Sequence, residues 1–191
     1  EQAVTLVVPV PTFTAKGATI NEETGKATTL VFDIKLVADV KVAPSFEQQE
    51  DAVTVQRIEN IPTKDNDRIT ITLPLAPNVM TVANRMFVKH TKAANTIYNY
   101  LAHRAYSGNA IEFTTLHGFS EFEISKTGNY VAVVDGELYA TLQAAVDAVA
   151  NNGIIELLKD GTAEVKKAIT FDVWRYYDGG THPANIKATI T

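Results

Sequence analysis

Apolar and polar side chains alternate along the first two thirds of the chain, and this alternation predicts antiparallel β-strands. From residue 4 to about residue 124 the dominant period is two, which places successive side chains on opposite faces of a sheet. In TLVFDIKLVADV, residues 29–40, we expect Phe32 and Ile34 to face a core and Lys35 to face solvent. RITITLPL, residues 68–75, repeats the pattern and predicts a second strand.

Further strands are expected between short turns that are rich in Gly, Pro, Asn and Asp. They cover residues 4–10, 53–58, 86–90, 97–102, 110–115 and 119–124. Many short strands with no helical period between them favour a β-sandwich over a sheet that alternates with helices. We therefore expect residues 1–126 to form a sandwich domain.

The pattern changes after KTGN, residues 126–129. VAVVDGELYA predicts a hairpin, because Asp135 and Gly136 suit the positive φ angles of a two-residue type I′ turn. Thr141 is a predicted N-cap, and the apolar residues that follow it recur at three- and four-residue spacing, which predicts one stripe of an amphipathic helix. The stripe consists of Leu142, Ala145, Val146 and Val149.

The helix is expected to end at Asn152 and Gly153, a pair that suits a left-handed C-cap. GIIELL, residues 153–158, predicts a strand that is covered on both faces. A last pair of strands is expected at residues 165–174 and 185–190, joined by the loop YYDGGTHP. Residues 127–191 therefore predict a small α/β unit in which one helix packs on strands.

Length and composition narrow the classes of function. The 191 residues, 46% of them hydrophobic, suffice for one large core or two small ones. The formal net charge of -5, with no cluster of Lys and Arg, argues against nucleic acid as a partner. The absence of cysteine removes disulfides, thiolate metal sites and a Cys nucleophile. No apolar run reaches the roughly 20 residues that a membrane-spanning helix needs, so no membrane insertion is expected.

The start of the chain suggests a fragment. It begins at Glu1, without a methionine and without the basic and apolar regions of a signal peptide. We therefore expect an excised or processed piece of a longer protein, with neighbouring domains in the same chain. Any targeting or anchoring signal would then lie outside these residues.

The segment GNYVAVVDGELYATLQAAVDAVANNGIIELLKDGT, residues 128–162, resembles a segment of large surface proteins of Gram-positive, often gut-dwelling, bacteria. The family form is roughly a short hairpin, then Y-x-T-L-x-x-A-V-x-A-A, a polar turn and I-x-L-L-K-D. The matching positions are Tyr139, Thr141, Leu142, Ala145, Val146, Ile155, Leu157, Leu158, Lys159 and Asp160. In that family the segment usually leads into right-handed parallel β-helix coils, so the resemblance implies that residues 127–191 open such a β-helix.

The preceding segment, from RITITLPL to GFSEFEI, is similar to an immunoglobulin-like sandwich module of the same kind of surface protein. That module runs I-T-I-x-L-P, then V-x-H, and closes on F-T-T-x-H-F-S. Residues 69–74, 88–90 and 113–120 match it, with Gly118 inserted between the histidine and the phenylalanine of the last motif. The inserted glycine is expected to mark a β-bulge.

Together the resemblances imply a mainly β fold, with an immunoglobulin-like β-sandwich over residues 1–126 and a small α/β unit with one helix over residues 127–191. They imply a non-enzymatic, adhesin-like module of a secreted or cell-wall-attached bacterial protein, serving as a spacer or in adhesion to a host or glycan surface. The location would be extracellular, at the cell surface or cell wall. They transfer no catalytic residue to this chain.

Histidines do not indicate a metal site. His90, His103, His117 and His182 are widely separated, and none has the spacing or partner pattern of a zinc site. The sequence also lacks a nucleophile elbow and a Gly-rich phosphate loop, so acyl and phosphoryl transfer have no support. No metal or cofactor is expected, and hydrogen bonding or packing is the better interpretation of His117, beside a predicted strand.

Paired carboxylates are the groups that catalyse glycoside hydrolysis, and β-helix proteins often act on polysaccharides. The candidate pairs are Glu121 with Glu123 and Asp172 with Asp178. Glu121 and Glu123 alternate with apolar residues, which is typical of the solvent face of a half-buried strand. A catalytic hydrolase or lyase is therefore the weakest of three functional classes.

Aromatic residues near the C-terminus are the most suggestive binding feature. Sugar rings stack on exposed aromatic faces while nearby Asp and His side chains bond to hydroxyls. The candidate ligand-binding residues are Trp174, Tyr176, Tyr177, Asp178 and His182. They suggest an alternative function, a carbohydrate-binding accessory domain of a polysaccharide-active enzyme. In the competing interpretation, Phe171 and Trp174 pack on the helix stripe and the tyrosines anchor an ordinary loop.

An isopeptide cross-link between a lysine and an asparagine is a further hypothesis, suggested by the absence of cysteine in a surface module. Lys35 is the lysine placed most firmly in a predicted strand. Its alternation with Phe32 and Ile34 puts it on the opposite face, so exposure is the simpler interpretation.

Overall fold

The computed structural model describes residues 3–59, 61, 63, 67–172 and 188–191. These residues are mainly β, as predicted, with one α-helix, α1 (Leu142–Ala148), and one 3-10 turn, η1 (Gln49–Asp51). The first eight strands are β1 (Val4–Ile20), β2 (Ala27–Ala43), β3 (Val53–Ile58), β4 (Ile69–Pro74), β5 (Arg85–Ala93), β6 (Thr96–Arg104), β7 (Ala110–Thr115) and β8 (Glu121–Ser125). The later strands are β9 (Ala132–Val134), β10 (Glu137–Tyr139), β11 (Gly153–Leu157), β12 (Gly161–Ala163), β13 (Ile169–Asp172) and β14 (Ala188–Ile190).

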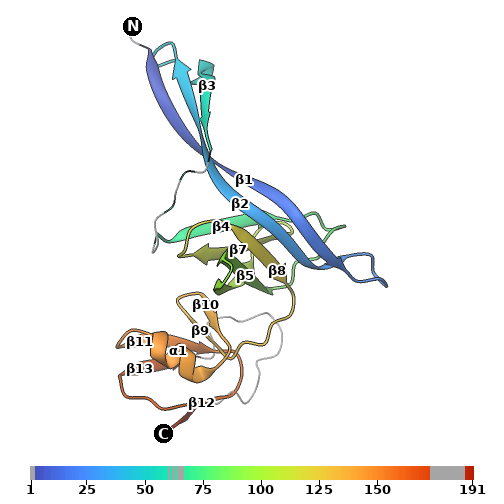
Figure 1. Ribbon diagram of the computed structural model, residues 1–191, viewed down its shortest axis with the longest axis vertical. Helices are drawn as coiled ribbons and strands as arrows, with labels where there is room; N and C mark the ends of the chain where they lie inside the picture. The colour runs from blue at the N-terminus through green and yellow to red at the C-terminus, as the bar shows by residue number, and fades with distance from the viewer. Residues whose placement is uncertain (1–2, 60, 62, 64–66, 173–187) are drawn as a thin grey trace.

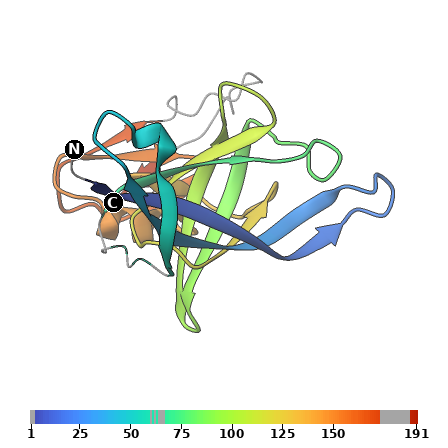
Figure 2. The same cartoon turned by 90° about the horizontal axis from the view of Figure 1, so that it is seen from above.

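Strands β2 and β4 to β8 surround the core of the predicted β-sandwich, with β1 along the outer edge of β2. β3 is exposed along its length and pairs with residues 38–42 of β2, and this end of β1 and β2 projects from the sandwich together with β3 (Figures 1 and 2). One layer has the order β1-β2-β8-β5-β6, and the sheet then turns over through β7, which pairs with β4. The turn is sharp because β6 and β7 pair only at His103↔Glu112 and Arg104↔Ile111. The core between the layers is apolar, with Phe122, Ile124 and Met86 fully buried. Each such side chain contributes about 1.5–3 kcal/mol of burial free energy.

The alternation in the sequence sets the faces of these strands correctly. Phe32 and Ile34 are buried in the sandwich core, while Lys35, which follows Ile34, is exposed. The bounds of β3 and β7 equal the predicted ones. A strand predicted at residues 4–10 instead continues to Ile20, because β1 stays paired with β2 through a register shift between Ala15 and Gly17. Pro and Gly residues in that stretch are unusual in strands, so the sequence pattern does not reveal that the strand continues.

The edge strand β1 carries two prolines, whose placement protects the sheet. Pro9 lies opposite Ala38 and Pro11 opposite Leu36. A proline has no N–H, so neither pair exchanges backbone hydrogen bonds, and both prolines turn their nitrogen toward the free edge. The carbonyl of Leu36 agrees with this, since it faces away from β1 and accepts from the N–H of Ile61 at 2.7 Å. The middle of the free edge thus lacks two donors for another strand.

The C-terminal unit, made of β9 to β14 and α1, has a core of its own in which α1 packs on β9 and β12. Thr141 caps the helix as predicted, since its hydroxyl accepts from the N–H of Ala144 at 3.2 Å. The predicted stripe is buried, and Ala145 is fully covered. Asp135 and Gly136 adopt the positive φ angles of the predicted hairpin turn, at 50° and 90°.

Two local predictions in this unit are wrong. The helix ends at Ala148, because Val149 already has an extended ψ of 141° and turns inward to stay buried. Asn152 does adopt a left-handed φ of 63°, but in the turn that leads into β11. β11 is also covered less evenly than predicted, since Ile154 is 41% exposed while Glu156 is only 7% exposed.

Two parallel strand pairs complete the C-terminal unit. β11 pairs with β13, and β12 pairs with β14. Two consecutive strands, β11 and β12, therefore pair in the same order with the next two strands of the chain, β13 and β14. The predicted final strands at 165–174 and 185–190 are shorter where they are described, at Ile169–Asp172 and Ala188–Ile190. No helix among the described residues has the length and apolarity needed to cross a bilayer.

The sandwich and the C-terminal unit share one sheet. Glu137 of β10 pairs with Tyr100 of β6, and the N–H of Leu101 donates to the carbonyl of Gly136 at 2.9 Å. A small third core of Leu101, Val133 and Leu138 lies beneath this pairing. The sheet therefore continues from β6 through β10 and β9 to β11 and β13.

We expect the double variant Pro9→Val, Pro11→Val to self-associate, because it restores two N–H donors on the free edge of β1 and raises its strand propensity. Analytical ultracentrifugation over a range of protein concentrations measures this. Thr12→Val is the matched control, since it also introduces valine into β1 but at a position that already has its N–H and whose backbone faces β2; it removes only the hydrogen bond from the Thr12 hydroxyl to the Lys35 carbonyl, at 3.3 Å. A double variant that stays as monomeric as the control would contradict the assignment of the prolines.

Candidate functional site

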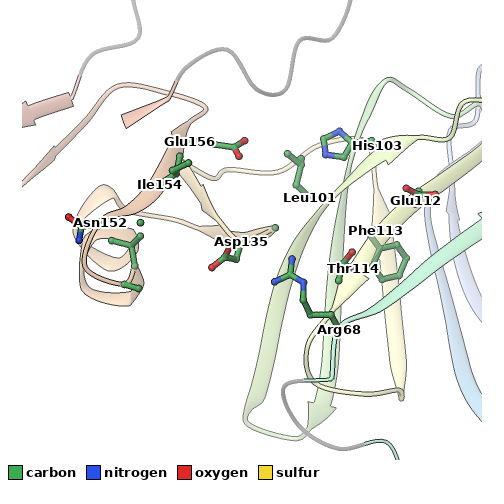
Figure 3. A pocket seen from close by; sticks show the side chains of 14 residues that line it. Arg68, Leu101, His103, Glu112, Phe113, Thr114, Asp135, Asn152, Ile154 and Glu156 are labelled. Carbon is green, nitrogen blue, oxygen red and sulfur yellow. The ribbon is translucent and has the colours of Figure 1, made fainter. Parts of the chain in front are cut away.

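A hollow with a mixed polar lining lies where the sandwich meets the C-terminal unit (Figure 3). This inter-unit cleft has a volume of about 410 Å³. Its polar and charged lining residues are Arg68, His103, Glu112, Thr114, Asp135, Asn152 and Glu156. Leu101, Phe113 and Ile154 supply apolar wall. None of these residues was singled out for ligand binding by the sequence.

The sandwich side of the cleft presents residues of β6 and β7. His103 and Glu112 lie opposite each other in the β6–β7 pairing. The Glu112 carboxylate accepts from the hydroxyl of Thr72 at 3.2 Å, which fixes its direction. Burial lowers the pKa of His103, Arg85 lowers it further, and Glu112 opposes both. His103 is therefore a neutral donor and acceptor at pH 7.

The opposite side presents residues of the C-terminal unit. Asp135 projects from the β9–β10 turn and Asn152 from the turn before β11, and both have positive φ. Glu156 lies on β11 opposite Val133 and extends toward the side that carries His103 (Figure 3). The sequence does contain a signal for a polar site at Glu156, because this is the one charged residue in the apolar run GIIELL. A carboxylate in a covered strand needs polar surroundings.

The inter-unit cleft suits a polar ligand better than an apolar one. Arg68 donates hydrogen bonds, the carboxylates of Glu112 and Asp135 accept them, and Asn152 does both. This mixture of donors and acceptors beside a limited apolar wall is complementary to a molecule rich in hydroxyl groups. Among the described residues no group of His, Asp and Glu is arranged to hold a metal ion.

The residues predicted to bind a ligand fall outside the part of the chain that the structure describes. This applies to Trp174, Tyr176, Tyr177, Asp178 and His182. Their neighbour Phe171 is described, and it packs against the core of the C-terminal unit. This contact agrees, for Phe171, with the interpretation that the aromatic group packs on the helix stripe. Asp172 ends β13, so its proposed partner in a carboxylate pair is also outside the description.

The other carboxylate pair forms a solvent face, as interpreted from the sequence. Glu121 is exposed and Glu123 is half-buried, while Phe122 between them and Ile124 after them are fully buried. The Glu123 carboxylate lies 3.5 Å from the ammonium of Lys89 on the neighbouring strand. An exposed pair of this kind contributes at most about 1 kcal/mol.

The V-x-H and F-T-T-x-H-G-F-S motifs meet inside the sandwich. His90 is fully buried and stacks on Phe122, with ring centroids 4.2 Å apart. Its Nε2 lies 2.8 Å from the hydroxyl of Ser120, which itself donates to the carbonyl of Thr91 at 2.8 Å. Because Ser120 has only one proton to donate, His90 carries its own proton on Nε2. Nδ1 is then a buried acceptor without a hydrogen-bond partner among the described residues.

The second histidine of the motif ties the sandwich to the C-terminal unit. His117 Nε2 lies 2.8 Å from Oε1 of Glu137 on β10, and the His117 ring stacks on Tyr98 at 3.4 Å. The inserted Gly118 has a φ of 73° and belongs to the loop before β8. The sequence predicted a β-bulge at this position. The structure has a loop residue with a left-handed backbone instead, a conformation that glycine adopts most easily. Thr115 closes the loop, since its hydroxyl lies 3.2 Å from the carbonyl of Gly118.

Lys35 has the exposure that its alternation predicts. Its side chain is 52% exposed, and its ammonium lies 3.9 Å from a carboxylate oxygen of Asp33 on the same face. An isopeptide cross-link within the sandwich core needs a buried lysine, so Lys35 is not suited to one.

Comparison with known proteins gives no further assignment, because no family model, curated protein or solved structure matches the chain.

Buried His90 predicts a specific dependence of stability on pH. Burial, then His117 and Lys92, lower the pKa of His90 from 6.5 to about 4. The unfolded state therefore binds the extra proton first, and stability is lost as pH falls from about 6.5 to about 4, by about 3 kcal/mol in total. Urea unfolding at pH 7, 5.5 and 4 measures the loss. In His90→Leu the chain is less stable at pH 7 but loses about 3 kcal/mol less on acidification; an equal loss in both proteins would contradict the argument.

Proposed function

We propose that the chain is a non-enzymatic module of a secreted or cell-wall-attached bacterial surface protein, and that it acts as a spacer or supports adhesion. The proposal takes its family and extracellular location from the resemblance of residues 69–120 and 128–162 to such proteins. The observation that carries the spacer role is the sheet that passes without a break from the sandwich into the C-terminal unit.

The shape of the molecule supports the same role. The start of β1 and the end of β14 lie at opposite ends of the longest axis (Figure 1). A pull on the two ends of the chain is therefore directed along the molecule and through the junction of β6 and β10. There a ladder hydrogen bond from Leu101, the hydrogen bond between His117 and Glu137, and the contacts of Leu138 resist separation together.

Parallel pairing in the C-terminal unit supports the idea that it opens a β-helix. In a β-helix each coil pairs strand by strand and in parallel with the next coil. The pairs β11 with β13 and β12 with β14 have this relation, and α1 packs on β12, the second strand of the first coil. The unit would then be the capped beginning of a stack of coils.

A second candidate function is a carbohydrate-binding accessory domain of a polysaccharide-active enzyme. The inter-unit cleft favours it, because the cleft offers carboxylate acceptors at Glu112 and Asp135 and donors at Arg68 and Asn152. These groups match the hydroxyls of a neutral sugar. The aromatic residues Trp174 and Tyr177 remain the sequence-based candidates for ring stacking in this function.

The spacer proposal predicts that the chain unfolds as one unit. In urea, far-UV circular dichroism and the fluorescence of Trp174, the only tryptophan, are expected to give coincident transitions. Leu138→Ala empties part of the core at the junction, so it is expected to cost about 2–5 kcal/mol and to separate the two transitions.

Tyr106→Ala is the control for this experiment, because Tyr106 is fully exposed in a turn and its removal leaves the junction intact. Two separate transitions in the unmodified protein would show that the units unfold independently and would argue against a spacer that transmits force from one unit to the other.

The carbohydrate-binding candidate predicts saturable binding on an array of neutral plant and mucin glycans. Glu112→Gln and Asp135→Asn, which keep the shape of each side chain, are then expected to weaken binding by about tenfold each, since a charged acceptor is lost. Trp174→Ala and Tyr177→Ala test the stacking residues. Glu121→Gln, an exposed carboxylate outside the cleft, is the control. An array without binding, or equal losses in the control, would remove this candidate.

A further inference from the structure

The free edges of the sandwich differ in how well they are protected. Among the described residues β1, β3 and β4 each pair with one strand only, so each presents a row of unpaired backbone groups. β1 carries Pro9 and Pro11, and β3 carries the charged Arg57 and a register shift opposite Val40. Such features hinder the addition of another strand. β4 has no register shift and no charged residue, and its only proline is its last residue, Pro74.

Two hydrogen bonds fix which backbone groups of β4 face its free edge. The N–H of Leu75 donates to the carbonyl of Asn109 at 2.8 Å, on the side of β7. Ala110, opposite Pro74, turns its carbonyl away from β4, because this carbonyl accepts from the N–H of Ala105 at 2.8 Å. Consecutive residues of a strand point their backbone groups to opposite sides. Odd-numbered residues of β4 therefore face β7, and even-numbered ones face outward.

The free edge of β4 thus offers the N–H and C=O groups of Thr70 and Thr72. These groups bond to no other described residue, and both threonines are exposed. Ile71 and Leu73, which alternate with them, are buried in the sandwich core. Arg68 precedes the strand and is exposed on the solvent face, where it lines the inter-unit cleft (Figure 3). The edge therefore combines an open backbone row with an apolar side, a hydroxyl side and one positive charge.

We infer that the free edge of β4 binds an extended segment of another protein, which adds to the sheet as an antiparallel strand. An open row of N–H and C=O groups is complementary to the backbone of such a segment. Its aliphatic residues extend the core beside Ile71 and Leu73, and its threonines pair with Thr70 and Thr72. An acidic residue near its C-terminal end lies opposite Arg68. This binding goes beyond the spacer role and does not rest on it.

The test is an NMR titration of the ¹⁵N-labelled protein with the peptide GSVTVTVEG, acetylated and amidated. We expect saturable shifts that centre on the amide signals of Thr70 and Thr72. The control peptide is N-methylated on both threonine amides, so it keeps the side chains but lacks the donors that face β4, and no shifts are expected from it. Absence of shifts with the first peptide, equal shifts with both, or shifts centred on β1 or β3 would overturn the inference.

A proline in β4 makes the test specific. Thr70→Pro removes one outward N–H while the ladder to β7 stays complete, so it is expected to weaken binding at least about tenfold. Thr70→Val is the matched control, since it loses the same hydroxyl, which lies 3.1 Å from that of Thr114, but keeps the N–H. Thermal unfolding verifies the fold of both variants. Equal affinities of the two variants for the peptide would contradict strand addition.

Arg68→Gln tests the orientation of the segment without altering the backbone of β4. It is expected to weaken binding of the peptide about threefold, and to leave unchanged the binding of a peptide with glutamine in place of glutamate. An equal effect on both peptides would overturn the pairing of Arg68 with the acidic residue.

A second copy of the chain is the competing occupant of this edge. If amide signals of β4 broaden as protein concentration rises without peptide, and Thr70→Pro removes the broadening, the chain itself occupies the edge and the inference fails.

Discussion

The addition of β10 to the edge of β6 is the interaction on which the rest of the molecule depends. Without it the sandwich would end in an open strand edge and the C-terminal unit would have no fixed orientation. The strand pairing at this edge is short, being Glu137 opposite Tyr100 with one further hydrogen bond to Leu101. Such a short ladder holds only because side chains on both of its faces support it.

Those side chains connect the junction to the motifs of the sandwich. On one face Leu101, Val133 and Leu138 exclude water. On the other, Glu137 accepts from His117 and from the hydroxyl of Tyr139 at 3.1 Å. Burial, and then the Glu137 carboxylate, raise the pKa of Tyr139, so this hydroxyl remains a donor over the whole physiological range. The F-T-T-x-H-G-F-S motif therefore orients the C-terminal unit, which gives its histidine a structural role.

Much of the fold could be predicted from sequence because it depends on local chemistry. Alternation placed Phe32, Ile34 and the other core-facing residues, and the Asp135-Gly136 turn and the Thr141 cap need only their own neighbours. The prediction failed where a distant partner decides the outcome. β1 extends to Ile20 because β2 is there to pair with it, and Val149 leaves the helix to reach the core.

The inter-unit cleft could not be predicted from the sequence, and the reason is physical. It joins Arg68 and Glu112 of the sandwich to Asp135 and Glu156 of the C-terminal unit. These residues are far apart in the chain, and only the sheet order brings them together. The hydrogen bond between His117 and Glu137 lies at the same junction, so the contact that orients the C-terminal unit on the sandwich also fixes the two walls of the cleft relative to each other.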